Sequence, residues 1–137
     1  MHKKLMDMRP VDDIVTQTTP GLKIWDEVWG GMQCAYHIFA PGTDFTDILK
    51  GKGFEHDLCG VEHWAYVLKG TLEVIYLDGT IEHCSAGECC YWPAPHNFKS
   101  AAGAEIIQFS AGGALADLRR INSVSFFREY LCRSASS

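Results

Sequence analysis

Hydrophobic and polar residues alternate along this chain in a series of short segments separated by turn residues. β-branched and aromatic side chains with a period of two are typical of strands, and Gly, Pro and Asp-Gly are typical of turns. Turns recur about every 8 to 12 residues, which is the pattern of a β-sandwich or barrel. The segments that we predict to be strands are 22–29, 32–39, 62–68, 71–77, 80–84, 88–92, 97–100 and 104–109.

Weaker patterns lie before, within and after this series. Residues 12–19, ended by Pro20-Gly21, are predicted to form an edge strand. Residues 44–54 contain many glycines and polar residues, which favours a loop or a short strand across the barrel mouth. Residues 114–121 have helical composition, so we expect a short helical C-terminal tail over about residues 114–133. Four apolar residues of this tail have the i, i+3, i+4 spacing of a helix: Phe126, Phe127, Tyr130 and Leu131.

The alternation assigns a face to each residue of the segment 61–68. If His63 faces the interior, so do the other odd-numbered residues from 61 to 67. The opposite face then carries Glu62, Trp64, Tyr66 and Leu68. A large aromatic face needs cover, either from the N-terminal strands or from a partner subunit. We expect a homodimer.

The 137 residues are enough for one domain with one core, and 47% of them are hydrophobic. The formal net charge of −5 argues against nucleic acids or anionic membranes as partners, because both require a basic surface. No apolar run approaches the length of about 18 residues that a membrane span needs. A small-molecule ligand is the expected partner.

Six cysteines in a short chain are compatible with a secreted disulfide scaffold. However, the leader from His2 to Asp7 lacks the apolar segment of a secretion signal. We therefore expect a cytoplasmic protein with free thiols. Cys89 and Cys90 are adjacent, so a strand would point them to opposite faces.

Two groups of residues have the order and spacing of known motifs. They are Tyr66-Val67-Leu68-Lys69-Gly70, followed by Asp78-Gly79, and then Ala86-Gly87-Glu88 with Pro93-Ala94-Pro95-His96. Together they resemble the two motifs of the cupin superfamily, over roughly residues 35 to 110. Residues 63–70 are most similar to small bacterial single-domain cupins. The resemblance implies an all-β, cupin-type double-stranded β-helix (jelly-roll) barrel, with one domain over 1–137 and a core barrel at about 32–112.

The resemblance also implies where metal ligands belong. In the usual first motif, two histidines one residue apart are followed, four or five residues later, by a glutamate. This glutamate lies seven residues before the closing glycine, and the second motif adds a histidine. Counted back from Gly70, the glutamate position is His63. The paired-histidine positions fall on Asp57 and Cys59 or, with the longer spacing, on His56 and Leu58. Of the four ligands, only the histidine of the second motif, His96, is present in its usual place.

The substituted residues still form a plausible donor set. Cys59 and His63 are four apart, so an unbroken strand places them on one face, and His96 approaches from a neighbouring strand. A thiolate and two neutral imidazoles with an open fourth position suit Zn²⁺ better than Mn²⁺ or Mg²⁺. His56 or Asp57 could complete the set. Iron is the alternative metal, and no nucleotide cofactor is expected.

Structural roles compete with these assignments. His63 can be a wall histidine bonded to a backbone carbonyl, and a cysteine such as Cys59 is often buried for packing alone. His37 and His83 lie on other strands and are assigned structural or exposed roles. Glu62 points away from His63 by parity, so we do not assign it as a catalytic base.

Two classes of function fit the sequence. In the first, a small cupin enzyme uses a bound divalent metal on a small organic molecule in the barrel. In the second, a metal-free barrel binds or senses a small ligand without catalysis. Asp44 and Asp47 near the mouth are candidate acids or bases, or solvated loop carboxylates. The reaction and the catalytic residues stay unassigned.

Overall fold

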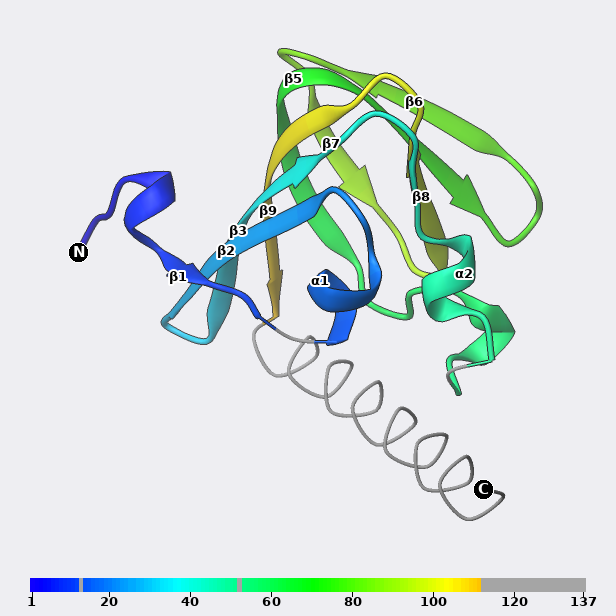
Figure 1. The fold of residues 1–137 in the computed structure, drawn as a ribbon, viewed down its shortest axis with the longest axis horizontal. Helices are drawn as coiled ribbons and strands as arrows, with labels where there is room; N and C mark the ends of the chain where they lie inside the picture. Colours follow the sequence, from blue (N-terminus) through cyan, green and yellow to red (C-terminus); the bar gives the residue numbers. More distant parts are fainter. Residues whose placement is uncertain (13, 52, 112–137) are drawn as a thin grey trace.

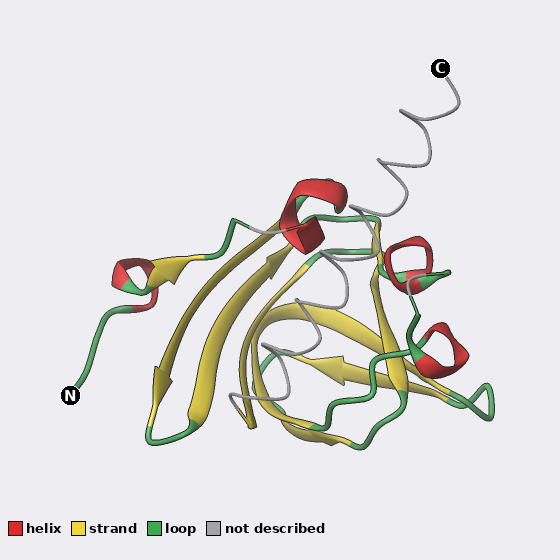
Figure 2. Cartoon of the chain, turned by 90° about the horizontal axis from the view of Figure 1, so that it is seen from below, coloured by secondary structure: helices red, strands yellow, loops and turns green. Residues whose placement is uncertain are grey.

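The computed structural model describes residues 1–12, 14–51 and 53–111. Its strands wrap around a common interior, and short helices lie outside them (Figure 1, Figure 2). The strands are β1 (Arg9–Pro10), β2 (Leu22–Trp29), β3 (Met32–Phe39), β4 (Thr43–Asp44), β5 (His63–Tyr76), β6 (Ile81–Ser85), β7 (Cys89–Trp92), β8 (His96–Ser100) and β9 (Ala104–Ala111). The helical segments are η1 (Leu5–Asp7), α1 (Ile14–Thr18), α2 (Thr46–Leu49) and η2 (Glu55–Asp57).

Strand β5 organises the sheet because it belongs to both halves of the barrel. Its first part, 63–70, pairs with β7 on one side and β9 on the other. Its second part, 71–76, pairs with β6 and β8. The full path runs β1-β2-β3-β9-β5-β8-β4, with β6 and β7 attached to β5. A single curled, antiparallel sheet therefore encloses the interior, as predicted.

The sequence pattern located most of these strands. Segments 22–29 and 32–39 match β2 and β3 at both ends, and the segments predicted for β6 to β9 overlap the observed strands. The parity prediction is also confirmed, because His63, Ala65 and Val67 are buried while Trp64 and Tyr66 are exposed. Alternation alone thus identified which side chains of β5 enter the barrel.

The predicted edge strand at residues 12–19 is wrong, because this segment contains α1. Local side-chain bonds favour the compact turn: the Thr16 hydroxyl donates to the carbonyl of Val11, and the Gln17 amide donates to the Asp12 carboxylate. Such bonds satisfy polar groups without a neighbouring strand. The edge of β2 is instead paired with β1, where Arg9 lies opposite Asp26.

The two strands predicted at 62–68 and 71–77 are one continuous strand, β5. Gly70, between the two predicted segments, lies inside the strand with a φ of +71°, next to a register shift between Val67 and Lys69. A Cβ atom at Gly70 would lie 2.0 Å from the carbonyl oxygen of Gly103. The glycine therefore permits a bulge and a close backbone approach, which a local sequence pattern cannot distinguish from a turn.

The interior is apolar over most of its length. Aromatic rings of Phe39, Phe45 and Phe98 contact one another in series. Trp92 packs edge-on against Phe98 and is fully buried. The buried apolar cluster comprises Val11, Leu22, Ile24, Ala35, Phe39, Ala65, Val67, Leu72, Val74, Cys84, Trp92, Phe98, Ala104 and Ile106.

Between β3 and β5 the described residues form only short elements. Segment 44–54 includes the end of β4 and the short helix α2, in agreement with the absence of a long strand there. Within the described residues, no helix is both long and apolar enough to span a bilayer. The predicted tail at about 114–133 lies outside the described residues.

We predict that Gly70→Ala lowers the free energy of unfolding by about 3 kcal/mol or more, because it adds a backbone clash to a positive φ. Gly79→Ala is the matched control, since Gly79 has a φ of +85° but its Cβ would meet nothing within 4 Å. We expect that control to lose only about 1 kcal/mol. Urea unfolding followed by circular dichroism measures both values. Equal losses would show that the approach of Gly103 does not constrain β5.

Candidate metal centre

Three potential metal ligands meet inside the barrel. Cys59 Sγ and one ring nitrogen each of His63 and His96 all lie within 4.8 Å of one another. The Sγ atom of Cys59 is 3.6 Å from Nε2 of His63, and the two imidazole centroids are 5.0 Å apart. These residues are 6%, 2% and 0% exposed, respectively, so the cluster is shielded from solvent.

The fold brings these residues together from three segments. His63 begins β5 and His96 begins β8, so each histidine stands where a loop enters a strand. Cys59 lies before β5 and forms an isolated bridge with His96. In that bridge the Cys59 amide donates to the His96 carbonyl at 2.7 Å, and the His96 amide donates to the Cys59 carbonyl at 3.2 Å. Main-chain bonds therefore hold the thiol next to the second histidine.

The tautomer of His96 follows from its hydrogen bond. Nδ1 lies 2.8 Å from the carbonyl oxygen of Pro93, which can only accept. Nδ1 therefore carries the proton, and Nε2 has a free lone pair. This Nε2 atom is buried and has no hydrogen-bond partner among the described residues. An unsatisfied buried acceptor in a native fold needs an explanation.

His63 is held on its other side by a serine. Its Nδ1 atom lies 2.5 Å from the hydroxyl oxygen of Ser110, a fully buried residue of β9. When Nδ1 donates to this oxygen, the lone pair of Nε2 faces the Cys59 sulfur. The thiol also lies 3.7 Å from the carbonyl oxygen of Val61. His63 thus has one nitrogen beside Ser110 and a second nitrogen beside Cys59.

The protonation states are set by burial. Desolvation, with smaller contributions from His96 and His37, lowers the pKa of His63 to about 2. Burial also lowers the pKa of His96, although the bond to Pro93 opposes this shift. Burial raises the pKa of the Cys59 thiol to about 11, against the effect of its bond to Val61. Near neutral pH both imidazoles are neutral and able to donate lone pairs, while the thiol keeps its proton unless a cation replaces it.

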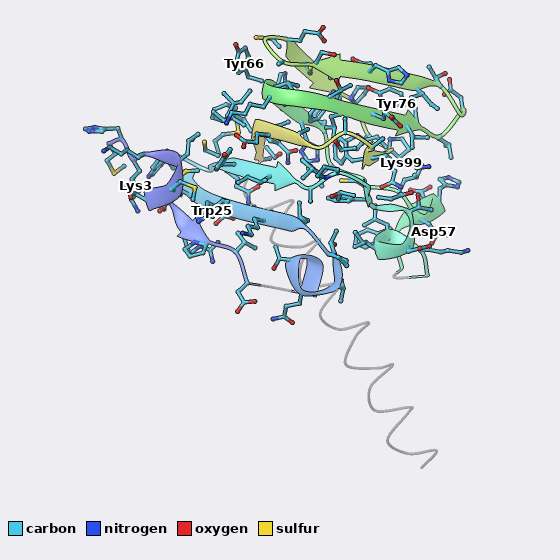
Figure 3. All side chains as sticks on the ribbon, turned by 45° about the horizontal axis from the view of Figure 1, so that its top comes forward. Lys3, Trp25, Asp57, Tyr66, Tyr76 and Lys99 are labelled. Atoms are coloured by element: carbon cyan, nitrogen blue, oxygen red, sulfur yellow. The ribbon has the colours of Figure 1, made fainter. Side chains whose placement is uncertain are left out.

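His56 is not brought into this cluster. It lies in η2 with a φ of 58°, its side chain is half exposed, and its Nε2 atom is 3.6 Å from Glu55 Oε1. The neighbouring Asp57 accepts a hydrogen bond from the Gly51 amide at 2.9 Å and lies at the outside of the molecule (Figure 3). The three inner residues therefore stand without either of the two candidates for a fourth ligand.

The other candidates have local partners. Glu62 points outward, as parity predicted, and accepts a hydrogen bond from the Tyr91 hydroxyl at 2.6 Å. Asp44 caps the Thr46 amide at 2.8 Å and lies 3.5 Å from the Lys99 ammonium. These bonds lower the pKa of Asp44, although burial opposes them, so it has the character of a paired loop carboxylate.

Several interior polar residues were missed by the sequence analysis. Asp26 is fully buried and accepts hydrogen bonds from the Arg9 guanidinium and the Gln33 amide, both at 2.7 Å. Gln108 and Ser110 lie on the inward face of β9. Their signal was the alternation of β9, in which Ile106, Gln108 and Ser110 share a parity. A polar residue at an inward position of an apolar strand marks it as a candidate for the site.

No protein-family model matches the sequence, and no curated protein is significantly similar to it. Solved structures do match. An RmlC-like cupin from Shewanella frigidimarina has 18% identity and a TM-score of 0.56, covering 80% of this chain and 88% of that one.

Two further matches have names that denote a catalyst. The polyketide cyclase RemF from Streptomyces resistomycificus has 15% identity and a TM-score of 0.57, with 82% and 79% of the two chains covered. Ectoine synthase from P. lautus has 12% identity and a TM-score of 0.58, with 85% and 84% covered. At these identities the similarity is one of fold. The curled sheet and these matches together show that the chain has the fold of the cupin superfamily.

Proposed function

We propose that the barrel binds a divalent metal, Zn²⁺ in preference to iron, through Cys59 Sγ and the Nε2 atoms of His63 and His96. The bound metal would serve a reaction of a small organic molecule held in the barrel. The single observation that carries this proposal is the buried, unpartnered Nε2 lone pair of His96. Most buried acceptors in native folds have a donor, whereas this one belongs to a cluster with Cys59 and His63.

The spacing of one donor pair fits this metal. With Zn–S near 2.3 Å and Zn–N near 2.05 Å, a tetrahedral angle separates a sulfur and a nitrogen ligand by about 3.6 Å. Cys59 Sγ and His63 Nε2 are 3.6 Å apart. A thiolate with two imidazoles is a soft to intermediate donor set, which favours Zn²⁺ over Mg²⁺, Mn²⁺ or an oxygen-ligated iron. Three protein ligands would leave one position open, as in catalytic zinc sites.

The residues around the cluster would orient the ligands and exclude water. The Pro93 carbonyl fixes the ring of His96, and the Ser110 hydroxyl fixes the ring of His63. Hydrogen bonds to the non-ligating nitrogen set the tautomer and raise the basicity of the ligating one. Phe98 lies against both imidazoles, with ring centroids 6.0 Å from His63 and 4.8 Å from His96. A metal held there would polarise a ligand oxygen as a Lewis acid.

The second candidate function is a metal-free barrel that binds a small ligand. Its support is that Cys59 and His63 can satisfy each other, with the thiol protonated at neutral pH. In that case a donor group of the ligand would meet His96 Nε2. Between the two functions we favour the metal site, because Cys59, His63 and His96 form a buried donor set whose Cys59–His63 spacing fits a shared metal ion.

We predict that purified, untagged protein carries close to one zinc per chain, and that His63→Ala and His96→Ala abolish it. His56→Ala is the matched control and should keep the metal, because its half-exposed side chain lies outside the cluster. Elemental mass spectrometry after desalting measures the content. Wild type that stays metal-free after incubation with zinc would overturn the metal proposal and leave the metal-free barrel.

Ser110 should contribute to affinity through His63. We predict that Ser110→Ala weakens zinc binding by about 10-fold or more, the usual effect of losing a hydrogen bond behind a ligating histidine. Ser100→Ala is the control, since Ser100 is equally buried but donates to the Thr71 carbonyl at 2.8 Å. Competition with a chromogenic chelator gives both affinities. If the two variants bind zinc equally well, the Ser110 bond does not support the site.

The metal-free protein should lose stability in acid because its histidines are buried in the neutral form. The unfolded chain binds a proton at His63 below about pH 6.5, whereas the folded state resists protonation down to about pH 2. The free energy of unfolding therefore falls as the pH decreases below about 6.5, by up to about 1.4 kcal/mol per pH unit for each such histidine. His96 adds to the same trend.

Urea unfolding in chelator at pH 7.5, 6.5 and 5.5 measures this slope. His63→Gln should make it shallower, while His83→Gln, at an exposed position of β6, serves as the control. A slope unchanged by His63→Gln would mean that this histidine is already protonated in the folded state.

A further inference from the structure

Two tautomers of His63 are compatible with its hydrogen bonds, and only one of them offers a metal ligand. The neutral imidazole carries a single ring proton. If Nδ1 holds this proton, it donates to the Ser110 hydroxyl oxygen at 2.5 Å, and Nε2 presents a lone pair toward Cys59. If Nε2 holds it, the Ser110 hydroxyl donates to Nδ1, and an N–H group faces the thiol. The destination of the Ser110 hydroxyl proton therefore decides whether His63 can bind a cation.

A buried acceptor lies across the sheet from this hydroxyl. Gln33 on β3 is the register partner of Ser110 on β9. The two residues are 3% and 0% exposed, and both lie on the inward face of their strands. Directly opposite residues have Cβ atoms about 4.5–5.5 Å apart, which is within reach for a glutamine amide and a serine hydroxyl. The Oε1 atom of Gln33 is buried and has no hydrogen-bond partner among the described residues.

The orientation of the Gln33 amide is fixed by Asp26 on β2. The Nε2 atom of Gln33 donates to Oδ2 of Asp26 at 2.7 Å. A carboxylate can only accept hydrogen bonds, so the amide nitrogen must face it and Oε1 must be the free end of the amide. Asp26 lies two residues from Val28, the register partner of Gln33, so this bond is a diagonal contact between neighbouring strands. Gln33 therefore has an acceptor, and not a donor, available for Ser110.

The charge of Asp26 is balanced from the surface. Asp26 is fully buried, where an unpaired carboxylate would be strongly unfavourable. Arg9 on β1 is its register partner, and the Arg9 Nη2 atom donates to Asp26 Oδ1 at 2.7 Å. The strands β1, β2, β3, β9 and β5 follow one another across the sheet (Figure 1). A row of polar residues thus crosses these strands: Arg9, Asp26, Gln33, Ser110 and His63.

We propose that Gln33 is a positioning residue that fixes the tautomer of His63. Its Oε1 atom accepts the hydroxyl proton of Ser110, so Ser110 accepts from His63 Nδ1, and His63 Nε2 keeps its lone pair. Without this acceptor the Ser110 proton turns toward Nδ1, and zinc binding first requires the ring proton to leave Nε2. The inference rests on the proposed metal site, and it gives a role in that site to a strand, β3, that supplies none of the three proposed ligands.

Nuclear magnetic resonance of the zinc-free protein tests the proposal, because the ¹⁵N shifts of the ring nitrogens distinguish the two tautomers. Wild-type His63 should carry its proton on Nδ1. Gln33→Met keeps the length of the side chain but removes the acceptor, and it should shift the tautomer ratio about tenfold toward Nε2–H, the effect of losing one buried hydrogen bond. Thr43→Val is the control and should leave the ratio unchanged, since it removes a buried hydroxyl of β4 that donates to the Ala40 carbonyl at 2.6 Å.

Zinc affinity gives a second readout, which separates positioning from a general loss of stability. Gln33→Met should weaken zinc binding about tenfold in the wild-type background but should have no effect in the Ser110→Ala background, because Gln33 acts only through the Ser110 hydroxyl. The amide resonances of β6 should keep their positions in every variant, which shows that the barrel is folded. Gln33→Leu lacks the same acceptor and replaces Gln33→Met if the β6 resonances move.

The tautomer and the zinc affinity can each contradict the proposal. A wild-type His63 with its proton on Nε2, or a wild-type tautomer in Gln33→Met, would overturn it whether or not the protein binds zinc. Equal losses of zinc affinity from Gln33→Met in the two backgrounds would overturn it as well. Wild type that binds no zinc would overturn the proposed function alone, because the effect of Gln33 on the tautomer is measured without metal.

Discussion

The passage of one strand through both halves of the barrel is the constraint on which the rest of this structure depends. β5 pairs with four strands, and its strict alternation turns His63 inward and Trp64 outward. Gly70 makes the passage possible, since any Cβ there would meet the carbonyl of Gly103. A shift of one residue in the register of the first half would exchange the two faces. The inner site and the outer aromatic face are thus fixed by the same backbone pairing.

The barrel tolerates polar groups inside because many of them are matched by a partner. Burying an unpaired charge costs several kcal/mol, and burying an unpaired hydrogen-bonding group costs about 1–3 kcal/mol. Each such group therefore requires a partner or a function. The charge of Asp26 is met by Arg9 and Gln33. His63 is met on both ring nitrogens, by Ser110 and by Cys59. Among the described residues, Gln33 Oε1, Asn97 Oδ1 and His96 Nε2 are buried acceptors without a hydrogen-bond partner. His96 differs from the other two because it belongs to a cluster of potential metal ligands.

Local alternation was sufficient to predict most of the sheet, because strand periodicity and turn residues are properties of neighbouring residues. It failed where a decision depended on distant residues. Gly70 resembles a turn until Gly103 is placed against it, and residues 12–19 lack a partner strand once Arg9 and Pro10 pair with β2. The candidate site was likewise predictable only where it did not depend on distant residues. Cys59, His63 and His96 were proposed from their positions in the motifs that resemble those of cupins. Ser110 lies 47 residues beyond His63 and becomes its neighbour only through the pairing of β5 with β9.

The proposal of a metal site, as opposed to a structural histidine cluster, rests on His96 and not on His63. A wall histidine bonded on both nitrogens needs no occupant, and His63 satisfies that description through Ser110 and Cys59. His96 does not, because the Pro93 carbonyl consumes its only proton and leaves Nε2 with a buried lone pair. Protonating that nitrogen is opposed by desolvation, which lowers its pKa. In the proposed metal site, a cation that displaces the proton of Cys59 would give this atom an electron-pair acceptor and would balance the charge of the thiolate.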